Sequence, residues 1–172
     1  MMEFLHRLTA FFEAVGQVTA VVLLVTVLVG GGWLAWLGAK SRRISPRLSP
    51  TGGPLLAVGE TPNWVSTTAR PADVLHYLAP RPCAVNPLPG LADRLEREGA
   101  RVQARTERYL HATCRSRRFG FVDDVELLYE PAAGMLHGRS ASRVGYSDLG
   151  VNRRRLEALL RGAGLAAARR PD

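Results

Sequence analysis

Apolar residues form one long uninterrupted run near the start of the chain. Residues 18–37 (VTAVVLLVTVLVGGGWLAWL) contain no charged side chain. At about 1.5 Å of rise per residue, a helix of this length matches the roughly 30 Å hydrocarbon core of a bilayer. We therefore predict a transmembrane helix over residues 18–39, with Trp33 and Trp36 in the membrane interface, where amphipathic aromatic rings are favoured.

The residues before this run also have a helical pattern. Their apolar positions recur at helical spacing, whereas Glu3, His6, Arg7 and Glu13 lie off the apolar stripe. We predict an interfacial amphipathic segment over residues 1–17, with Phe11 and Phe12 in the membrane interface. His6 is interpreted as an interfacial polar side chain rather than as a metal ligand.

Charge on either side of the run predicts a direction across the membrane. Basic residues follow it at Lys40, Arg42, Arg43 and Arg47, whereas Arg7 alone precedes it. The positive-inside rule then places the N-terminus outside and the domain that follows the membrane helix in the cytoplasm. A cleaved signal peptide would have its basic residues before an apolar run of about 7–15 residues, so the pattern favours a membrane anchor.

Small residues occupy one face of the predicted membrane helix. Gly31, Ala35 and Ala39 are spaced four residues apart, which allows another helix to approach closely. Small residues are also common in membrane spans without such a role, and the sequence leaves both interpretations open. Residues 40–62, rich in proline and glycine, are predicted to be a linker rather than a fold element.

Shorter patterns predict a small α+β domain over residues 63–172. Alternating apolar and polar positions indicate strands, and residues 131–134 (PAAG) indicate the turn of a hairpin. The predicted strands span residues 109–116, 122–130 and 135–143, and the predicted helices span residues 71–78, 91–98 and 152–161. This order favours an antiparallel sheet with a few helices, with residues 144–150 as a loop.

The chain is strongly basic, which suggests an acidic partner. Its 172 residues have a net charge of +8 and a pI near 10.7. Anionic lipid headgroups are the favoured partner because no known nucleic-acid-binding module accompanies the arginines of residues 153–170. Two cysteines, Cys83 and Cys114, are too few for a disulfide framework. Free thiols are the favoured interpretation, and a single bridge remains open.

Long phrases of the domain resemble a known family. They are TPNWVST at residues 61–67, YLHATCRSRRFGFVDDVELLYE at 109–130 and RSASRVGYSDLGVNRRRLEALL at 139–160. Residues 61–161 resemble the bacterial family catalogued as domain of unknown function 1499. The resemblance implies a small membrane-attached or exported protein, and with the anchor it implies a single-pass protein of the inner membrane. Trp64 stands where the family pattern has cysteine, so thiol chemistry is absent at that position.

Charged and polar residues within these phrases are the candidates for a ligand site. They are Arg115, Arg117, Asp123, Asp124, Arg139, Ser140, Arg143, Asp148, Asn152 and Arg153. Arginine binds carboxylates and phosphates through paired hydrogen bonds, so these groups could form a pocket for an anion with Asp123 or Asp124 as a base. Alternatively, the acids and arginines pair to fix the hairpin and the following loop, which is the favoured interpretation.

Other chemistry lacks a sequence signal. His111 and His137 lie on neighbouring predicted strands, but a metal site would need a third ligand. No phosphate-binding loop, dinucleotide fingerprint, haem-attachment motif or nucleophile elbow is present, and no cofactor or metal is predicted.

Together these patterns predict a non-enzymatic accessory subunit or assembly factor of a larger membrane complex, such as a respiratory or photosynthetic one. Its predicted partners are integral membrane subunits and anionic lipid headgroups. The alternative is an anionic-ligand-binding protein or hydrolase that uses the arginine, aspartate and serine cluster. A third hypothesis is a basic domain that binds lipid or nucleic acid.

Overall fold

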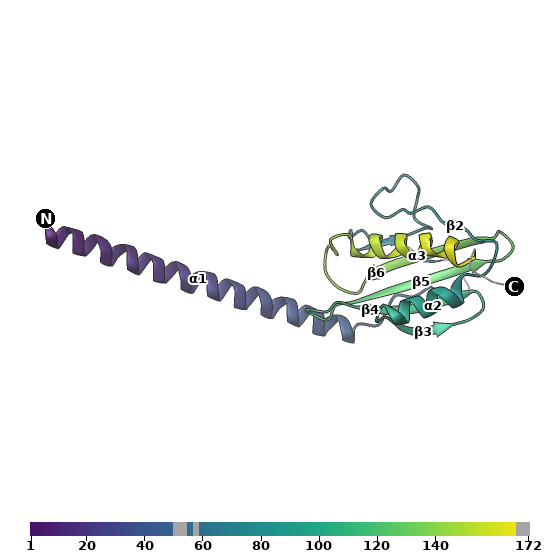
Figure 1. Cartoon of the computed structure of the whole chain (residues 1–172), viewed down its shortest axis with the longest axis horizontal. Helices are drawn as coiled ribbons and strands as arrows, with labels where there is room; N and C mark the ends of the chain where they lie inside the picture. Colours follow the sequence, from purple (N-terminus) through teal and green to yellow (C-terminus); the bar gives the residue numbers. More distant parts are fainter. Residues whose placement is uncertain (50–54, 57–58, 168–172) are drawn as a thin grey trace. The chain divides into compact units, whose positions relative to one another are not determined.

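The chain divides into two compact units, Met1–Trp36 and Leu37–Asp172. The computed structural model describes residues 1–49, 55–56 and 59–167, with side chains up to residue 163 (Figure 1). Each unit is described by itself below.

The first unit is the greater part of helix α1 (Met2–Arg43). The helix is continuous from the predicted interfacial segment through the predicted span, because no proline precedes Pro46 and helical spacing persists on both sides of Val18. Among the described residues, α1 is the one helix whose length and composition would allow it to cross a membrane. Its large apolar side chains are exposed, and Trp33 stacks on Trp36 with ring centroids 5.0 Å apart.

The second unit contains an antiparallel sheet with the strand order β1-β6-β5-β4-β3. A further short strand, β2, pairs with the opposite end of β6 from β1. The strands are β1 (Trp64–Ser66), β2 (Arg81–Pro82), β3 (Arg101–Arg105), β4 (Tyr109–Arg115), β5 (Val122–Glu130) and β6 (Met135–Ser142). The predicted α+β fold with an antiparallel sheet is confirmed.

The β5–β6 hairpin sets which side chains face each side of the sheet. Its register runs from Asp123 opposite Ser142 to Glu130 opposite Met135. Because successive side chains of a strand point to opposite faces, Val125 and Leu127 join the apolar core while Asp124 and Glu126 lie on the other face. The hairpin expected at these strands and this turn is confirmed.

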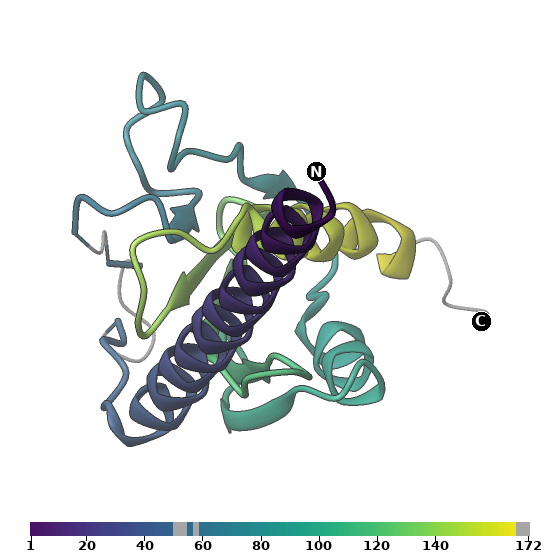
Figure 2. The same ribbon diagram turned by 90° about the vertical axis from the view of Figure 1, so that its left-hand side faces the viewer.

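Helices α2 (Leu88–Arg97) and α3 (Val151–Ala167) cover one face of the sheet (Figures 1 and 2). Leucines at helical spacing on both helices are buried against the strands, among them Leu91, Leu95, Leu156 and Leu159. Gly138 on β6 allows the close approach of α3, because a Cβ there would lie 2.5 Å from Leu156 Cδ1. We call this the helix face of the sheet.

Parts of the predicted linker cover the opposite face, which we call the strap face after residues 44–49 and 55–56. The backbone N–H of Ser49 donates to Glu126 Oε1 at 2.8 Å, and Leu55 packs on Tyr109 and Leu128. Figure 2 shows α2 and α3 on one side of the sheet and residues 44–49 on the other. Long-range contacts place these residues on the domain, although proline and glycine content had suggested only a spacer.

The last turns of α1, from Leu37 onward, belong to the second unit. Ser41 is buried, and its hydroxyl accepts a hydrogen bond from the backbone N–H of Val122 at 3.1 Å. A Cβ on Gly38 would lie 1.8 Å from the Phe119 carbonyl oxygen, so only glycine allows this contact. The end of the helix is thereby fixed to the turn between β4 and β5.

Three sequence predictions about elements differ from the structure. Residues 71–78 form turns instead of a helix, because Asp73 accepts hydrogen bonds from the backbone and ring of His76 and closes a tight turn. Strands β1, β2 and β3 were not predicted, since none of them has a clear apolar alternation. Helix α3 continues past the predicted stop at Gly162, beside which the Arg94 side chain packs.

Candidate functional site

The ten candidate site residues fall in three separate places of the second unit. Asp124, Arg139 and Arg143 lie on the strap face. Asp123, Ser140, Asp148, Asn152 and Arg153 lie around α3 on the helix face, and Arg115 and Arg117 lie at the turn between β4 and β5. The sequence pattern had suggested one pocket, so each place is described in turn.

A buried ion pair forms the centre of the strap face. Glu126 and Arg139 occupy opposed positions on β5 and β6, and their side chains, 0% and 2% exposed, pair directly. Glu126 also accepts a hydrogen bond from Tyr109 Oη at 2.7 Å, and Arg139 donates to the Arg47 carbonyl at 2.8 Å. Burial and the Glu126 carboxylate together raise the pKa of Tyr109, which keeps this phenol a hydrogen-bond donor.

A second carboxylate on the same face is held by two cationic or polar side chains. Arg143 donates to Asp124 from Nε at 2.7 Å and from Nη2 at 2.8 Å, while His111 Nε2 lies 2.9 Å from the same carboxylate. Burial acts to raise the pKa of Asp124, but the hydrogen bonds from Arg143 and His111 outweigh it and leave that pKa below its ordinary value. An effective general base at neutral pH needs a higher pKa, so this environment favours a structural carboxylate.

A cavity of about 470 Å³ opens beside these pairs. It is bounded by the strap residues Ile44, Ser45 and Arg47, by the segment from Gly59 to Asn63, and by the ends of β5 and β6. Asp124, Arg139 and Arg143 all reach its wall, but each is engaged in the pairs described above. Among the described residues, Nε of Arg139 is buried and has no hydrogen-bond partner.

The polar groups on the helix face attach α3 to the sheet. Asp123 accepts hydrogen bonds from Ser142 Oγ at 2.6 Å and Arg155 Nη2 at 2.9 Å. Buried Asn152 accepts a hydrogen bond from Ser140 Oγ at 2.6 Å and donates to the Asn63 carbonyl at 2.9 Å. Arg155 and Asn63 were not among the predicted site residues, although Arg155 belongs to the basic run of residues 153–170.

Asp148 and Arg153 fix the ends of loops. Asp148 accepts a hydrogen bond from the backbone N–H of Asn152 at 2.5 Å, a capping contact at the start of α3. Arg153 Nη2 donates to the carbonyls of Val74, Leu75 and Tyr77 and so holds the turns that replace the predicted helix. Both residues therefore have structural partners.

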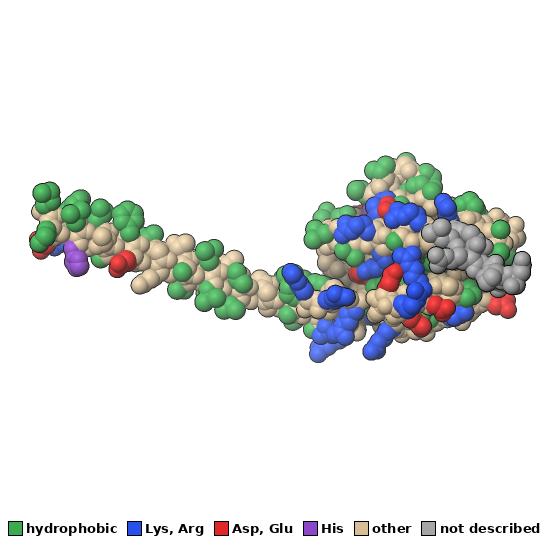
Figure 3. All heavy atoms as spheres, in the orientation of Figure 1, with side chains coloured by type: hydrophobic (Ala, Val, Ile, Leu, Met, Phe, Trp, Pro, Cys, Tyr) green, Lys and Arg blue, Asp and Glu red, His purple; other side chains and the backbone are tan. Residues whose placement is uncertain are grey.

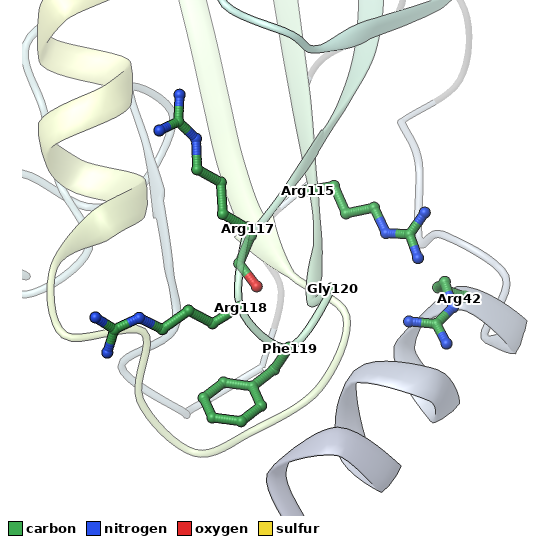
Figure 4. Close-up of a pocket in the computed structure, with 7 residues that line it drawn as sticks. Arg42, Arg115, Arg117, Arg118, Phe119 and Gly120 are labelled. Atoms are coloured by element: carbon green, nitrogen blue, oxygen red, sulfur yellow. The ribbon is translucent and has the colours of Figure 1, made fainter. Parts of the chain in front are cut away.

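The turn between β4 and β5 differs from these clusters because its arginines have no acidic partner. Arg115, Arg117 and Arg118 are exposed there and form no ion pair with a described residue. Together with Arg42 from the last turn of α1, they border a cavity of about 410 Å³ (Figure 4). Figure 3 shows Lys and Arg side chains gathered where α1 ends.

Thiols and histidines are dispersed over the domain. Cys83 and Cys114 are both free, and burial raises the pKa of each thiol, which makes them poor nucleophiles. His111 contacts Asp124, whereas His137 lies near Glu130 and Thr67. Among the described residues, no group of three or more His, Cys, Asp and Glu side chains is placed to hold a metal ion.

The candidate membrane residues all lie on α1. Phe11, Phe12, Trp33 and Trp36 are between 51% and 63% exposed. Gly31 has no atom within 4 Å of a Cβ built on it, so nothing in the described residues occupies that point of the helix surface.

Comparison with known families then places the domain. Residues 55–162 match the model of the family described as "Protein of unknown function (DUF1499)". The chain belongs to this family. No curated protein and no solved structure matches the chain.

The DUF1499 match covers all six strands, α2 and most of α3. It therefore contains the ten candidate residues, and it also contains Leu55 of the strap. Helix α1, with Arg42, and the strap residues 44–49 lie outside it. The contacts of Arg47 and Ser49 with the strap face thus join residues outside the match to buried charges inside it.

Proposed function

We propose that this DUF1499 protein is a non-enzymatic, membrane-anchored accessory subunit or assembly factor of a larger membrane complex. Helix α1 crosses the membrane and packs against integral membrane subunits, with the domain on the cytoplasmic side of the bacterial inner membrane. The observation that carries the proposal is the exposure of α1. From Val18 to Trp36 its large apolar side chains are exposed, between 38% and 69%.

The pairing of charges within the domain supports the same proposal. The buried carboxylates of β5 are Asp123, Asp124 and Glu126, and each is bound by an arginine. An arrangement of this kind suits a rigid scaffold better than a catalytic site, because fixed partners occupy the carboxylate oxygens. A respiratory or photosynthetic complex is the kind of assembly that such an anchored scaffold would join.

Purification in a mild detergent, followed by mass spectrometry of copurified chains, tests this function. We expect integral membrane subunits to be recovered with the full-length protein. Ala35→Leu should reduce that recovery several-fold, because it fills the small-residue face formed by Gly31, Ala35 and Ala39. Thr26→Leu is the matched control, since at 100° per residue Thr26 lies on the opposite side of the helix from Ala35. Recovery of the wild-type protein as a lone monomer would refute the proposal.

A second candidate function is binding of a small anion in the cavity beside the strap. The observation in its favour is an open volume of about 470 Å³ bordered by Arg47, Arg139 and Arg143. Titration with inorganic phosphate should then raise the melting temperature of the full-length protein. Arg47→Gln should abolish that rise, since Arg47 borders the cavity and its hydrogen bond with Arg139 uses the backbone carbonyl, which the substitution keeps. No rise with the wild-type protein would remove this candidate.

A further inference from the structure

Two arginine side chains from distant parts of the sequence converge above one glycine. Gly120, at the turn between β4 and β5, has a φ of +70°, a conformation that favours glycine. A Cβ built on it would lie 2.7 Å from Arg42 Nη1 and 3.2 Å from Arg115 Nε. Figure 4 shows the two guanidinium groups facing each other there, while Arg117 and Arg118 point elsewhere. The absence of a side chain at Gly120 creates the space that both groups occupy.

The convergence of two cations requires a physical explanation. Like charges at short range repel, so this arrangement is unfavourable without an anion or strong hydration between them. Elsewhere in the domain, Arg139, Arg143 and Arg155 approach the chain's interior only where a carboxylate binds them. Among the described residues, no side-chain hydrogen bond or ion pair involves the guanidinium group of Arg42 or of Arg115. Their donors are therefore available to an external anion.

The chemistry of the pair specifies the kind of anion. Each guanidinium presents a planar set of N–H donors that matches two oxygens of a phosphate. Two such groups on opposite sides of one space can bind a tetrahedral phosphate from two directions. The bordering cavity of about 410 Å³ is large enough to receive a headgroup, and it is lined by the turn from Arg115 to Gly120 and by Arg42.

The position of Arg42 on α1 indicates where that phosphate comes from. Arg42 follows Leu37, the last residue of the apolar run, by five residues. At about 1.5 Å of rise per residue this separation is about 8 Å, which is similar to the thickness of the lipid headgroup layer on one side of a bilayer. Phe119 and Phe121 pack edge-to-face at the same turn, with ring centroids 6.2 Å apart, and phenylalanine is among the side chains that enter the boundary between headgroups and acyl chains.

We propose that Arg42 and Arg115 bind the phosphate group of an anionic phospholipid above Gly120. The lipid joins the end of α1 to the β4–β5 turn, next to the direct contacts made by Gly38 and Ser41. This inference depends on the anchoring of α1 in a membrane, and it does not depend on the identity or existence of a partner complex.

Native mass spectrometry of the full-length protein in a mild detergent tests the site. Phosphatidylglycerol and phosphatidylcholine are added separately, and the fraction of protein that carries lipid is measured. We expect retention of phosphatidylglycerol to exceed that of phosphatidylcholine. The double variant Arg42→Gln/Arg115→Gln should lower retention of phosphatidylglycerol roughly tenfold, because hydrogen bonds to a charged phosphate are lost.

The matched control removes the same charge from the same turn. Arg117→Gln/Arg118→Gln should retain several-fold more phosphatidylglycerol than Arg42→Gln/Arg115→Gln, since Arg117 and Arg118 border the cavity but their side chains point away from Gly120. Equal losses in the two double variants would overturn the site and would indicate a general attraction between a basic surface and lipid. Arg42→Lys/Arg115→Lys should show an intermediate loss, because it keeps the charge but removes the planar donors.

Melting temperatures give an independent readout that a folding defect would not reproduce. Without lipid, Arg115→Gln should leave the melting temperature unchanged or raise it, because it removes repulsion from Arg42. With phosphatidylglycerol, the wild-type protein should gain stability and Arg115→Gln should not. A lower melting temperature of the variant without lipid would contradict the proposal.

Competition identifies the source of the phosphate. If inorganic phosphate displaces phosphatidylglycerol at comparable concentrations, the site recognises free phosphate and the lipid assignment is wrong. The two proposals fail separately. Loss of the lipid effect with normal recovery of partner subunits would overturn only this inference, whereas a lone protein that retains phosphatidylglycerol would overturn only the accessory role.

Discussion

The two faces of the DUF1499 sheet bury their side chains by different means. On the helix face, leucines from α2 and α3 pack against apolar residues of β5 and β6, so most of the contact depends on matching shapes, beside the polar pairs of Asp123 and Asn152. On the strap face, Glu126, Asp124 and Arg139 are equally inaccessible, at 0%, 4% and 2% exposed. A buried charge is tolerated only with a charged or polar partner in the correct geometry, so this face depends on specific pairs.

The comparison explains why the strap matters. Residues 44–49 supply backbone groups to the pairs on the strap face: Ile44 and Arg47 offer carbonyls to arginines, and Ser49 offers an N–H to Glu126. Backbone groups that bind side chains on the helix face come from elsewhere in the domain, such as the carbonyls of Asn63 and Val74, and not from residues 44–49. Stability of the strap face is therefore coupled to the segment that follows α1, whereas stability of the helix face is not.

The largest effect should come from removing one member of the buried pair. Arg139→Leu leaves the Glu126 carboxylate buried without its cation, and we expect a loss of about 3–5 kcal/mol in the free energy of unfolding. Chemical denaturation of the full-length protein in detergent measures it. The double variant Arg139→Leu/Glu126→Leu should recover much of that loss, because no uncompensated charge remains. A double variant as unstable as the single one would show that the pair is not the cause.

Shortening a buried side chain on the helix face should lower the free energy of unfolding somewhat less, and the loss should not depend on pH. Leu156→Ala removes buried methyl groups that pack beside Gly138, and we expect a loss of about 3 kcal/mol. Because no titrating group is involved, the loss should be the same at acidic and neutral pH in denaturation experiments. A loss that varies strongly with pH would mean that the two faces are not independent.

The pH dependence of stability should come from the strap face. The folded-state pKa of Asp124 is below its unfolded value, so Asp124 stabilises the fold above the unfolded pKa, and this contribution disappears as pH falls through the folded pKa. Asp124→Asn should lower the free energy of unfolding by about 2 kcal/mol at neutral pH, because hydrogen bonds to a charged carboxylate are lost. The variant should also show a weaker fall in unfolding free energy on acidification. If the unfolding free energy of the variant falls on acidification as steeply as that of the wild-type protein, groups other than Asp124 cause the acid dependence.

The smallest effect is expected where α1 joins the domain. Ser41→Ala removes the acceptor for the Val122 N–H, and the loss should be about 1 kcal/mol. Hydrogen exchange of the Val122 amide should accelerate in this variant, whereas exchange on the helix face at Leu156 should not change. Equal acceleration at both positions would indicate global destabilisation instead of a local contact.

The extent to which these features follow from sequence differs between elements. Alternation and a PAAG turn predicted the β5–β6 hairpin, because both are local signals. Residues 71–78 had a helical appearance, but an Asp73–His76 contact and carbonyl bonds from Arg153 hold them in turns. The residues of β3 are mostly exposed and lack apolar alternation, so only pairing with β4 reveals that strand.

The candidate site shows the same division. The sequence pattern marked Asp123, Asp124, Arg139 and Arg143 as candidate site charges and favoured their mutual pairing over a ligand pocket, and the structure pairs each of them with an opposite charge. It did not mark Tyr109 or Arg155 as site residues, since nothing in the local pattern separates them from ordinary strand or surface residues. Convergence of Arg42 and Arg115 was also not visible, because 73 positions separate them in the chain.

The sequence by itself determined the long apolar helix, the hairpin, the α+β class and the family. These features depend on runs, periodicity and long matching phrases, which are properties of neighbouring residues. Only the tertiary structure decided which charges are buried, which carboxylate binds which arginine, and that residues 44–49 cover a face of the sheet. Such outcomes depend on strand register and on contacts between residues far apart in the chain, and they follow from the need of every buried charge to find a partner in space.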